Sequence, residues 1–314
     1  MGFSVRACDS RSALRVWIAL WIVYLVWGST YLAIRYLVET IPALLGSGVR
    51  FFTAGVLLSL FLLVRGGWAA MRVTRSELVA CGVVGSALLL GGNGLVAVSE
   101  DLGTPSGVAA LIVATVPLWV VAFRRLSGEP VTWSTLLWVL AGFAGVALLL
   151  LPGEKPEGAT IGGILILVAA AFCWASGSFA SGRLLRVPSS PLRSNAWQML
   201  LGGAAMVLVG LLAGEGADVH PSEFSGESIA AFAYLVVAGS LVAYTAYVWL
   251  LQNAPISLTA TYAYVNPVVA IALGALFVDE ELTPVVIGAA AIIAASVAGT
   301  IRTRAPQPVA ALDE

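Results

Sequence analysis

Ten apolar runs, each close to the length of a membrane-spanning helix, follow one another through the chain of 314 residues. A bilayer core about 30 Å thick is crossed by roughly 20 helical residues. Only 11% of the residues are charged, against roughly 25% in soluble domains. The sequence therefore predicts an all-α membrane protein with ten transmembrane helices, at residues 16–37, 42–64, 78–98, 105–123, 131–151, 160–182, 192–213, 229–251, 257–277 and 284–301.

Arginine is distributed unevenly between the two sides of such a bundle. With the N-terminus in the cytoplasm, the outer loops hold a single basic residue, Lys155, and acids such as Glu100 and Asp101. Lysine and arginine concentrate on the cytoplasmic side of membrane proteins. Both termini are therefore predicted to be cytoplasmic, together with Arg6, Arg11, Arg15, Arg65, Arg72, Arg75, Arg124, Arg125, Arg183, Arg186, Arg193, Arg302 and Arg304.

An internal repeat divides the chain into halves of five spans each. "VWGSTYLAIRY" at 26–36 matches "CWASGSFASGR" at 173–183 and places Trp27 opposite Trp174. Further along, Arg50 falls opposite Gln198. Because five is odd, the second half must enter the membrane from the opposite side, which gives inverted repeats. The predicted organisation is a cytoplasmic tail at 1–15, a first repeat at 16–151, an outer linker at 152–159, a second repeat at 160–302 and a cytoplasmic tail at 303–314.

The motif "WGSTYLAIR", the arginine in the second span and the acidic ends after spans four and nine resemble the EamA-type family of drug/metabolite transporters. The resemblance covers nearly the whole chain. It implies a ten-helix carrier in which the first four helices of each half surround a central cavity and the fifth packs outside. It also implies export of amino acids, metabolites or toxic small molecules, and multi-pass insertion in the inner membrane of a bacterium.

Polar stripes on the two matched helices are the first candidates for a binding site. Residues three and four apart share a helix face, which aligns Trp27, Thr30 and Tyr31 on one helix and Trp174 and Ser178 on the other. Polar side chains are better tolerated beside a wet cavity than beside lipid. The alternative is packing, since small and hydroxyl residues also hold spans together.

Arg35 and Arg50 lie within the first two spans. Arg50 is deep in the second span and needs a partner; the candidates are a loop carboxylate, backbone carbonyls or the anion of a substrate, and the alternative is a structural role. Arg35 lies nearer the outer boundary, where Glu39 four residues on predicts a helical ion pair.

Further polar side chains in later spans extend the predicted substrate site. "GGNG" places an amide among glycines, which permit close approach of a ligand. Each residue alone fits packing as well as binding, but together they would make an amphipathic cavity for zwitterions or aromatic metabolites. These candidates are Asn93, Gln198, Tyr244, Tyr262 and Asn266.

Pro117 and Pro267 lie at mirrored places inside spans four and nine, where each proline removes a backbone hydrogen bond and kinks the helix. Small residues form ridges on spans five and ten, at Gly142 and Gly299 among others. Such faces permit close helix packing. They are predicted to support the scaffold, with a homodimer contact as the alternative.

The sequence excludes several other functions. A nearly neutral net charge gives no sign of nucleic-acid binding, and the scattered cysteines Cys8, Cys81 and Cys173 support no metal site. No cofactor is predicted, and the ATP-binding motif GxxxxGK[ST] is absent. The prediction is therefore a secondary transporter for a small-molecule substrate. The rival, a membrane enzyme acting on a lipid-linked substrate, lacks HExxH and G-x-S-x-G.

The driving force is predicted from the titratable residues. No Asp or Glu falls inside the ten predicted spans, and the single histidine, His220, lies in an outer loop. Proton-coupled carriers usually keep such a group in the membrane. The sequence therefore favours facilitated efflux or exchange, with coupling through Glu39 or Glu100 as the reserve hypothesis.

Overall fold

The computed structural model describes residues 10–149, 158–254 and 261–302. These residues form helices and their connections, with no strand in the described ranges. The predicted tail at 303–314, most of the predicted linker at 152–159 and the first nine residues lie outside them. In chain order the elements are α1 (Ser10–Ile22), η1 (Val23–Trp27), α2 (Gly28–Val38), α3 (Ala43–Met71), α4 (Arg75–Gly85), η2 (Ser86–Gly94), α5 (Leu95–Asp101), α6 (Ser106–Val113), α7 (Val116–Leu126), α8 (Trp133–Leu148), α9 (Ile161–Arg183), α10 (Pro191–Leu212), η3 (Glu215–Asp218), η4 (Pro221–Glu223), α11 (Gly226–Tyr234), η5 (Leu235–Val242), α12 (Ala243–Asn253), α14 (Tyr262–Phe277) and α15 (Pro284–Arg302).

Several of these elements join end to end into longer spans. Seven helices are long and apolar enough to cross a membrane, the longest being Ala43–Met71, and three more are apolar but shorter. The shorter ones are Trp133–Leu148, Val265–Phe277 and Pro284–Thr300. Large apolar side chains such as Leu60, Val237 and Leu140 are more than half exposed on the outside of the bundle, as expected of surfaces that face lipid. The count of ten spans stays a prediction.

Helix starts are fixed by side chains that the sequence places at the right positions. Thr74 accepts a hydrogen bond from the backbone of Glu77, whose carboxylate accepts one in return from the backbone of Thr74. Thr160 caps α9 in the simpler way, by accepting from the backbone nitrogen of Gly163 at 3.0 Å. Such caps satisfy the free N–H groups of the first turn, which explains why these helices begin where they do.

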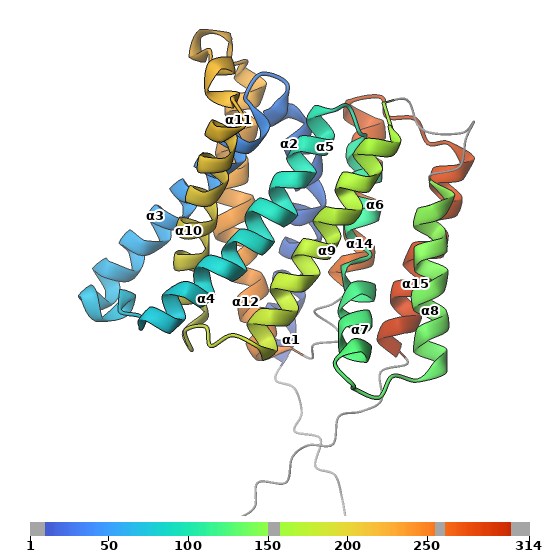
Figure 1. The fold of residues 1–314 in the computed structure, drawn as a ribbon, viewed down its shortest axis with the longest axis horizontal. Helices are drawn as coiled ribbons and strands as arrows, with labels where there is room; N and C mark the ends of the chain where they lie inside the picture. Colours follow the sequence, from blue (N-terminus) through green and yellow to red (C-terminus); the bar gives the residue numbers. More distant parts are fainter. Residues whose placement is uncertain (1–9, 150–157, 255–260, 303–314) are drawn as a thin grey trace, which may run out of the picture.

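Figure 1 shows α1 beginning and α15 ending at the same end of the bundle, which we call the terminal end. The connections α3–α4, α7–α8 and α9–α10 also lie there. Arg72 and Arg186 lie in two of these connections, and Arg124 lies in the last turn of α7. The connections α2–α3, α5–α6, α10–α11 and α14–α15 lie at the other end, which we call the opposite end.

Mirrored helices pack against each other where the sequence has small residues. Helix α3 crosses α10 so closely that a Cβ atom added at Gly203 would lie 2.6 Å from the backbone nitrogen of Phe52. At one edge of the bundle α8 lies beside α15 (Figure 1), with Gly142 against Ser296 and Gly299 against the ring of Trp138. These glycines therefore serve contacts within the chain, and the predicted homodimer stays a prediction.

Two carboxylates from the second half hold helix starts in the first half, both at the opposite end. Glu280 accepts hydrogen bonds from the backbone nitrogens of Ser106 and Gly107 at 2.6 and 3.0 Å. Glu215 does the same for Leu44 and Leu45 at 3.0 and 2.7 Å. The start of a helix carries partial positive charge and free N–H groups, so a carboxylate there is stabilising. The two halves are thereby joined at the opposite end.

Candidate functional site

A cavity lies inside the bundle between the two halves. Its volume, counted as space open to the centre of a water molecule, is about 120 Å³, and one water needs at least about 10–15 Å³ on that measure. The cavity therefore has room for several waters or one small solute. Its lining comes from the first four spans of each half, and no described residue of α8 or α15 contributes. This is the arrangement that the family resemblance implies.

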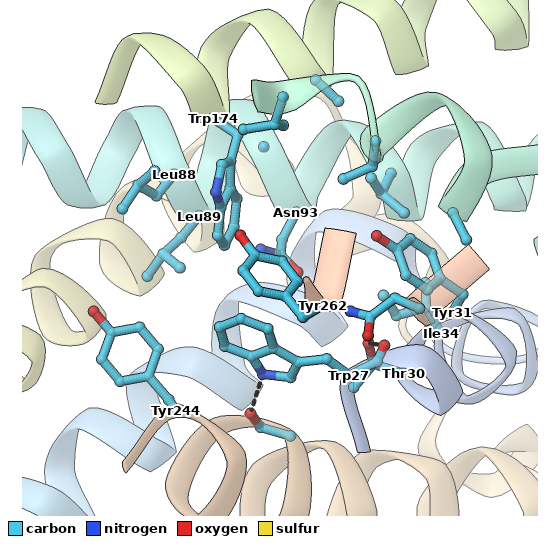
Figure 2. Close-up of a pocket in the computed structure, with 18 of the residues that line it drawn as sticks. Trp27, Thr30, Tyr31, Ile34, Leu88, Leu89, Asn93, Trp174, Tyr244 and Tyr262 are labelled. Carbon is cyan, nitrogen blue, oxygen red and sulfur yellow. Dashed lines mark hydrogen bonds between the residues drawn. The ribbon is translucent and has the colours of Figure 1, made fainter. Parts of the chain in front are cut away.

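One wall of the cavity is an aromatic cluster around Trp27. The ring centroid of Trp27 lies 5.0 Å from that of Tyr247, 5.3 Å from Tyr262 and 6.4 Å from Tyr244. Its indole N–H donates to the carbonyl of Gly239 at 3.2 Å, the dashed line in Figure 2. Aromatic pairs at such distances are stabilising beyond the area that they bury. Trp27 is therefore held in place by three ring contacts and one hydrogen bond.

Trp174 stands on the other side of the cavity, near Leu88 and Leu89 (Figure 2). A Cβ atom added at Gly92 would lie 2.7 Å from the Trp174 ring, so the glycine is what lets the indole pack there. In the described part of the chain, the indole N–H of Trp174 has no hydrogen-bond partner. Of the two indoles, only that of Trp174 therefore keeps an unused N–H in the described part of the chain.

Five polar residues complete the lining: Asn93, Asn195, Gln198, Ser240 and Asn266. Some of their hydrogen-bonding groups are used within the protein. Gln198 donates to the hydroxyl of Ser194 at 2.8 Å. With its amide nitrogen turned toward them, Asn266 donates to the carbonyls of Tyr262 and Tyr24 at 3.2 and 3.3 Å. The amide of Asn93 has no partner among the described residues, and thus remains available to a ligand.

The backbone is irregular where the spans meet the cavity. Three spans contain π-helical stretches, η1, η2 and η5, and each contributes lining residues. The fourth span breaks between α6 and α7, with Pro117 at the start of α7, and Pro267 lies inside α14. Irregular backbone at membrane depth is tolerated where it lines a cavity, and π-helical turns are frequent at functional sites. The predicted proline positions thus coincide with this site.

Arg50 and Ser178 are the two predicted site residues that the structure does not bring to the cavity lining. Arg50 is 3% exposed and lies behind Ser240, to whose hydroxyl its Nε donates at 3.4 Å. Its guanidinium also sits 4.2 Å from the ring centroid of Phe51. One nitrogen, Nη1, has no partner in the described ranges. A binding role for both residues stays a prediction.

The predicted Arg35–Glu39 ion pair is wrong. Arg35 reaches across to α5, where its Nη1 donates to the backbone carbonyl of Glu100 at 3.1 Å, and Glu39 is exposed. The placement of Glu100 in an outer loop is also wrong. It lies in helix α5 and its side chain is fully buried, because the helix continues past the end of the apolar run.

The terminal end has an ion-pair cluster. Glu129, between α7 and α8, pairs with Arg124 at 2.7 Å and with Arg183 at the end of α9. The hydrogen bond from Arg124 and the charge of Arg183 hold the pKa of the Glu129 carboxyl below its ordinary value. The described residues hold no group of three potential metal ligands.

Sequence reasoning missed the apolar part of the lining. Several cavity-lining residues are apolar, and in the sequence they look the same as residues that face lipid. They are Phe51, Leu88, Leu89, Val96 and Met199. The glycines of "GGNG" were the available signal, because Gly92 and Gly94 are both buried in η2.

The model of the EamA-like transporter family matches this chain twice, at residues 15–151 and 161–302. The chain belongs to that family. Among the relatives of this EamA-like transporter is the inner membrane transporter YedA of Escherichia coli K12, 38% identical over 275 residues, which are 88% of this chain and 87% of YedA. The protein is accordingly a multi-pass inner-membrane protein.

Two more distant relatives and one solved structure extend the comparison. Protein PecM of Dickeya dadantii is 27% identical over 82% of both chains. A protein of Escherichia coli K12 named "Probable amino-acid metabolite efflux pump" is 22% identical over 83% of this chain and 86% of its own. A crystal structure with 24% identity covers 92% of this chain and 97% of its own at a TM-score of 0.62, which shows that the fold is shared.

Proposed function

We propose that this protein is a secondary transporter that exports small amino-acid-like or aromatic metabolites across the inner membrane by alternating access, without ATP hydrolysis. The observation that supports this most is a cavity shared by the two halves, with Trp27 and Trp174, equivalent residues of the two repeats, on its two sides. Secondary transporters built from inverted repeats bind substrate at this place.

The proposal includes ten spans in two inverted repeats with both termini in the cytoplasm. Supporting it, mirrored helices pack together as α3 with α10 and α8 with α15. The family model matches two successive stretches of similar length. The terminal end is also the arginine-rich end, which is the cytoplasmic end by the positive-inside rule.

The chemistry of the lining supports the substrate class. Aromatic rings and aliphatic side chains surround a few separated amide and hydroxyl groups, Asn93 and Ser240 among them. Small-ligand sites typically combine an apolar surface with a few placed polar groups. A relative carries an amino-acid metabolite efflux name. Phenylalanine, an amino acid with an aromatic ring, is therefore the first substrate to test.

The test combines two assays. The first follows tritiated phenylalanine leaving loaded proteoliposomes, and the second labels a single cysteine introduced at the cavity. In a background with the native cysteines replaced by serine, Trp174→Cys should react with an impermeant maleimide and be protected by phenylalanine. Trp133→Cys is the matched control, since Trp133 is exposed on α8, outside the cavity, and should show no protection. Failure of phenylalanine to cross, or equal protection at both positions, would contradict the proposal for this substrate class.

A further inference from the structure

The buried carboxyl of Glu100 is a feature that the proposed function leaves unexplained. The residue is 0% exposed, and neither of its side-chain oxygens has a hydrogen-bond partner among the described residues. An ionised carboxylate without a partner in such a place costs several kcal/mol. A neutral acid costs much less, so Glu100 carries a proton in this conformation.

The groups around Glu100 come from several elements. From α2, Arg35 donates to the backbone carbonyl of Glu100 rather than to its carboxylate, and Tyr31 lies one helical turn before Arg35. Following α14, Glu280 acts on it as a like charge. Asp101 follows on the same helix and is exposed. Helix α6 contributes no titratable residue. Helix α9 meets α5 near its first turn, where the Ser99 hydroxyl donates to the carbonyl of Gly163. Its titratable residues, Cys173 and Arg183, lie further along, toward the terminal end.

This position ties the protonation of Glu100 to the join between the halves. Glu280 holds the start of α6, at Ser106 and Gly107, and this contact joins the two halves at the end of the bundle where Glu100 lies. If Glu280 leaves, water reaches Glu100, and the ionised form is stabilised by hydration and by the guanidinium of Arg35. Closing the contact again buries the carboxyl, which requires that it first take up a proton.

We propose that Glu100 is the proton-carrying residue of this transporter, taking up one proton each time the opposite end of the bundle closes. The step is the reversible binding of a proton to the carboxylate, with no other bond made or broken. Helix α2 connects this group to the substrate site, because Tyr31 lines the cavity and Arg35, one helical turn further on, holds the backbone of Glu100. The inference rests on the proposed function and replaces facilitated efflux with exchange of substrate for protons.

The first measurement needs no substrate. Infrared spectra of the purified full-length protein at neutral pH should contain the carbonyl stretch of a protonated carboxyl, and this band should disappear in Glu100→Gln. Asp101→Asn is the matched control, being the exposed neighbour on the same helix, and should retain the band. Identical spectra for the wild type and Glu100→Gln would overturn the proposal.

The second measurement uses proteoliposomes and tritiated phenylalanine. For exchange of one proton per solute, one pH unit corresponds to about a tenfold concentration ratio at steady state. The wild type and Asp101→Asn should reach such a ratio, while Glu100→Gln should stay near one and still exchange labelled for unlabelled phenylalanine. Glu100→Asp, which keeps the acid, should retain part of the ratio.

The outcomes separate this inference from the proposed function. A pH-driven ratio that is equal in the wild type and Glu100→Gln would overturn the inference and leave the transporter assignment standing. If phenylalanine does not cross in the wild type, the proposed function fails for that substrate class and the coupling role falls with it; the infrared band would then mark Glu100 as a structural acid. Loss of both exchange and the pH-driven ratio in Glu100→Gln, with no part of the ratio retained in Glu100→Asp, would also overturn the inference.

Discussion

The Trp27 wall and the Trp174 wall of the cavity are built from equivalent positions of the two repeats, yet they are held very differently. Trp27 is surrounded by three tyrosine rings and its N–H is bound to Gly239. Trp174 packs on a glycine, and its N–H has no partner in the described part of the chain. The repeat therefore places the two side chains at equivalent positions in the fold. Their different neighbours determine whether each is held by the protein or left free to contact a ligand.

This difference suggests a division of labour between the walls. A side chain held by several contacts cannot adjust to a ligand without losing them, so the Trp27 wall is suited to fixing the shape of the cavity. A side chain with an unused donor gains a hydrogen bond when a ligand arrives. The Trp174 wall is thus the one expected to make the specific polar contact.

The largest expected effect is on the stability of the folded protein, when Trp27 is removed from the Trp27 wall. Trp27→Ala should lower the free energy of unfolding by about 3 kcal/mol or more, the usual cost of truncating a packed tryptophan. Thermal melting in detergent measures it. Trp68→Ala, at an exposed tryptophan on α3, serves as control and should change the melting temperature little. Equal losses in the two variants would remove the contrast between the walls.

A somewhat smaller effect is expected at the packing surface of Trp174. In Gly92→Ala the new methyl group meets the indole ring, and overpacking of this kind costs typically 1–3 kcal/mol. Phenylalanine transport should fall with the melting temperature. Gly182→Ala is the matched control, since nothing lies within 4 Å of a Cβ atom there. If Gly92→Ala melts and transports like this control, Trp174 does not depend on Gly92.

The next effect is on binding rather than stability. Trp174→Ala removes an aromatic surface and a hydrogen-bond donor, so the half-saturation concentration for phenylalanine should rise about tenfold, or about 1.4 kcal/mol. Its loss of stability should be smaller than that of Trp27→Ala. Initial rates of uptake into proteoliposomes give the value. An unchanged half-saturation concentration would show that the free N–H of Trp174 is not a ligand contact.

The smallest effect concerns the terminal end of α9, the helix that carries Trp174. Ionised Glu129 pairs with Arg183 there, and its lowered pKa means that its stabilisation is present above the usual glutamate value and lost as pH falls through the folded-state value. Glu129→Gln should therefore melt slightly below the wild type at neutral pH. The difference should shrink below about pH 4 and in high salt. A difference that persists in acid would contradict an ionic origin.

Much of this molecule follows from its sequence. The apolar runs and the match around Trp27 and Trp174 led to the right family, because a helix in lipid must be apolar over a defined length. Nine of the predicted site residues line the cavity: Trp27, Thr30, Tyr31, Asn93, Trp174, Gln198, Tyr244, Tyr262 and Asn266. Polar residues inside spans are costly unless they face such a space, which is why they could be found; whether they bind substrate stays a prediction.

The rest depends on contacts between distant segments. Arg50 is screened from the cavity by Ser240, 190 residues away in the chain, and no periodicity reveals this. Glu100 was placed outside the membrane because hydropathy falls at the end of its run, although the helix goes on and neighbouring helices cover it. Hydropathy reports where apolar residues stop, not where burial stops.

The crossing of α3 and α10 has a mechanical consequence. Gly48, Gly55 and Gly203 bring the two backbones almost into contact, so the halves meet there as smooth rods with few interlocking side chains. Tilting one rod over the other at this point displaces fewer atoms than at any place where large side chains interdigitate. In the alternating access that we propose, this crossing is therefore the expected pivot, where a small rotation becomes a larger displacement at the terminal end and at the opposite end.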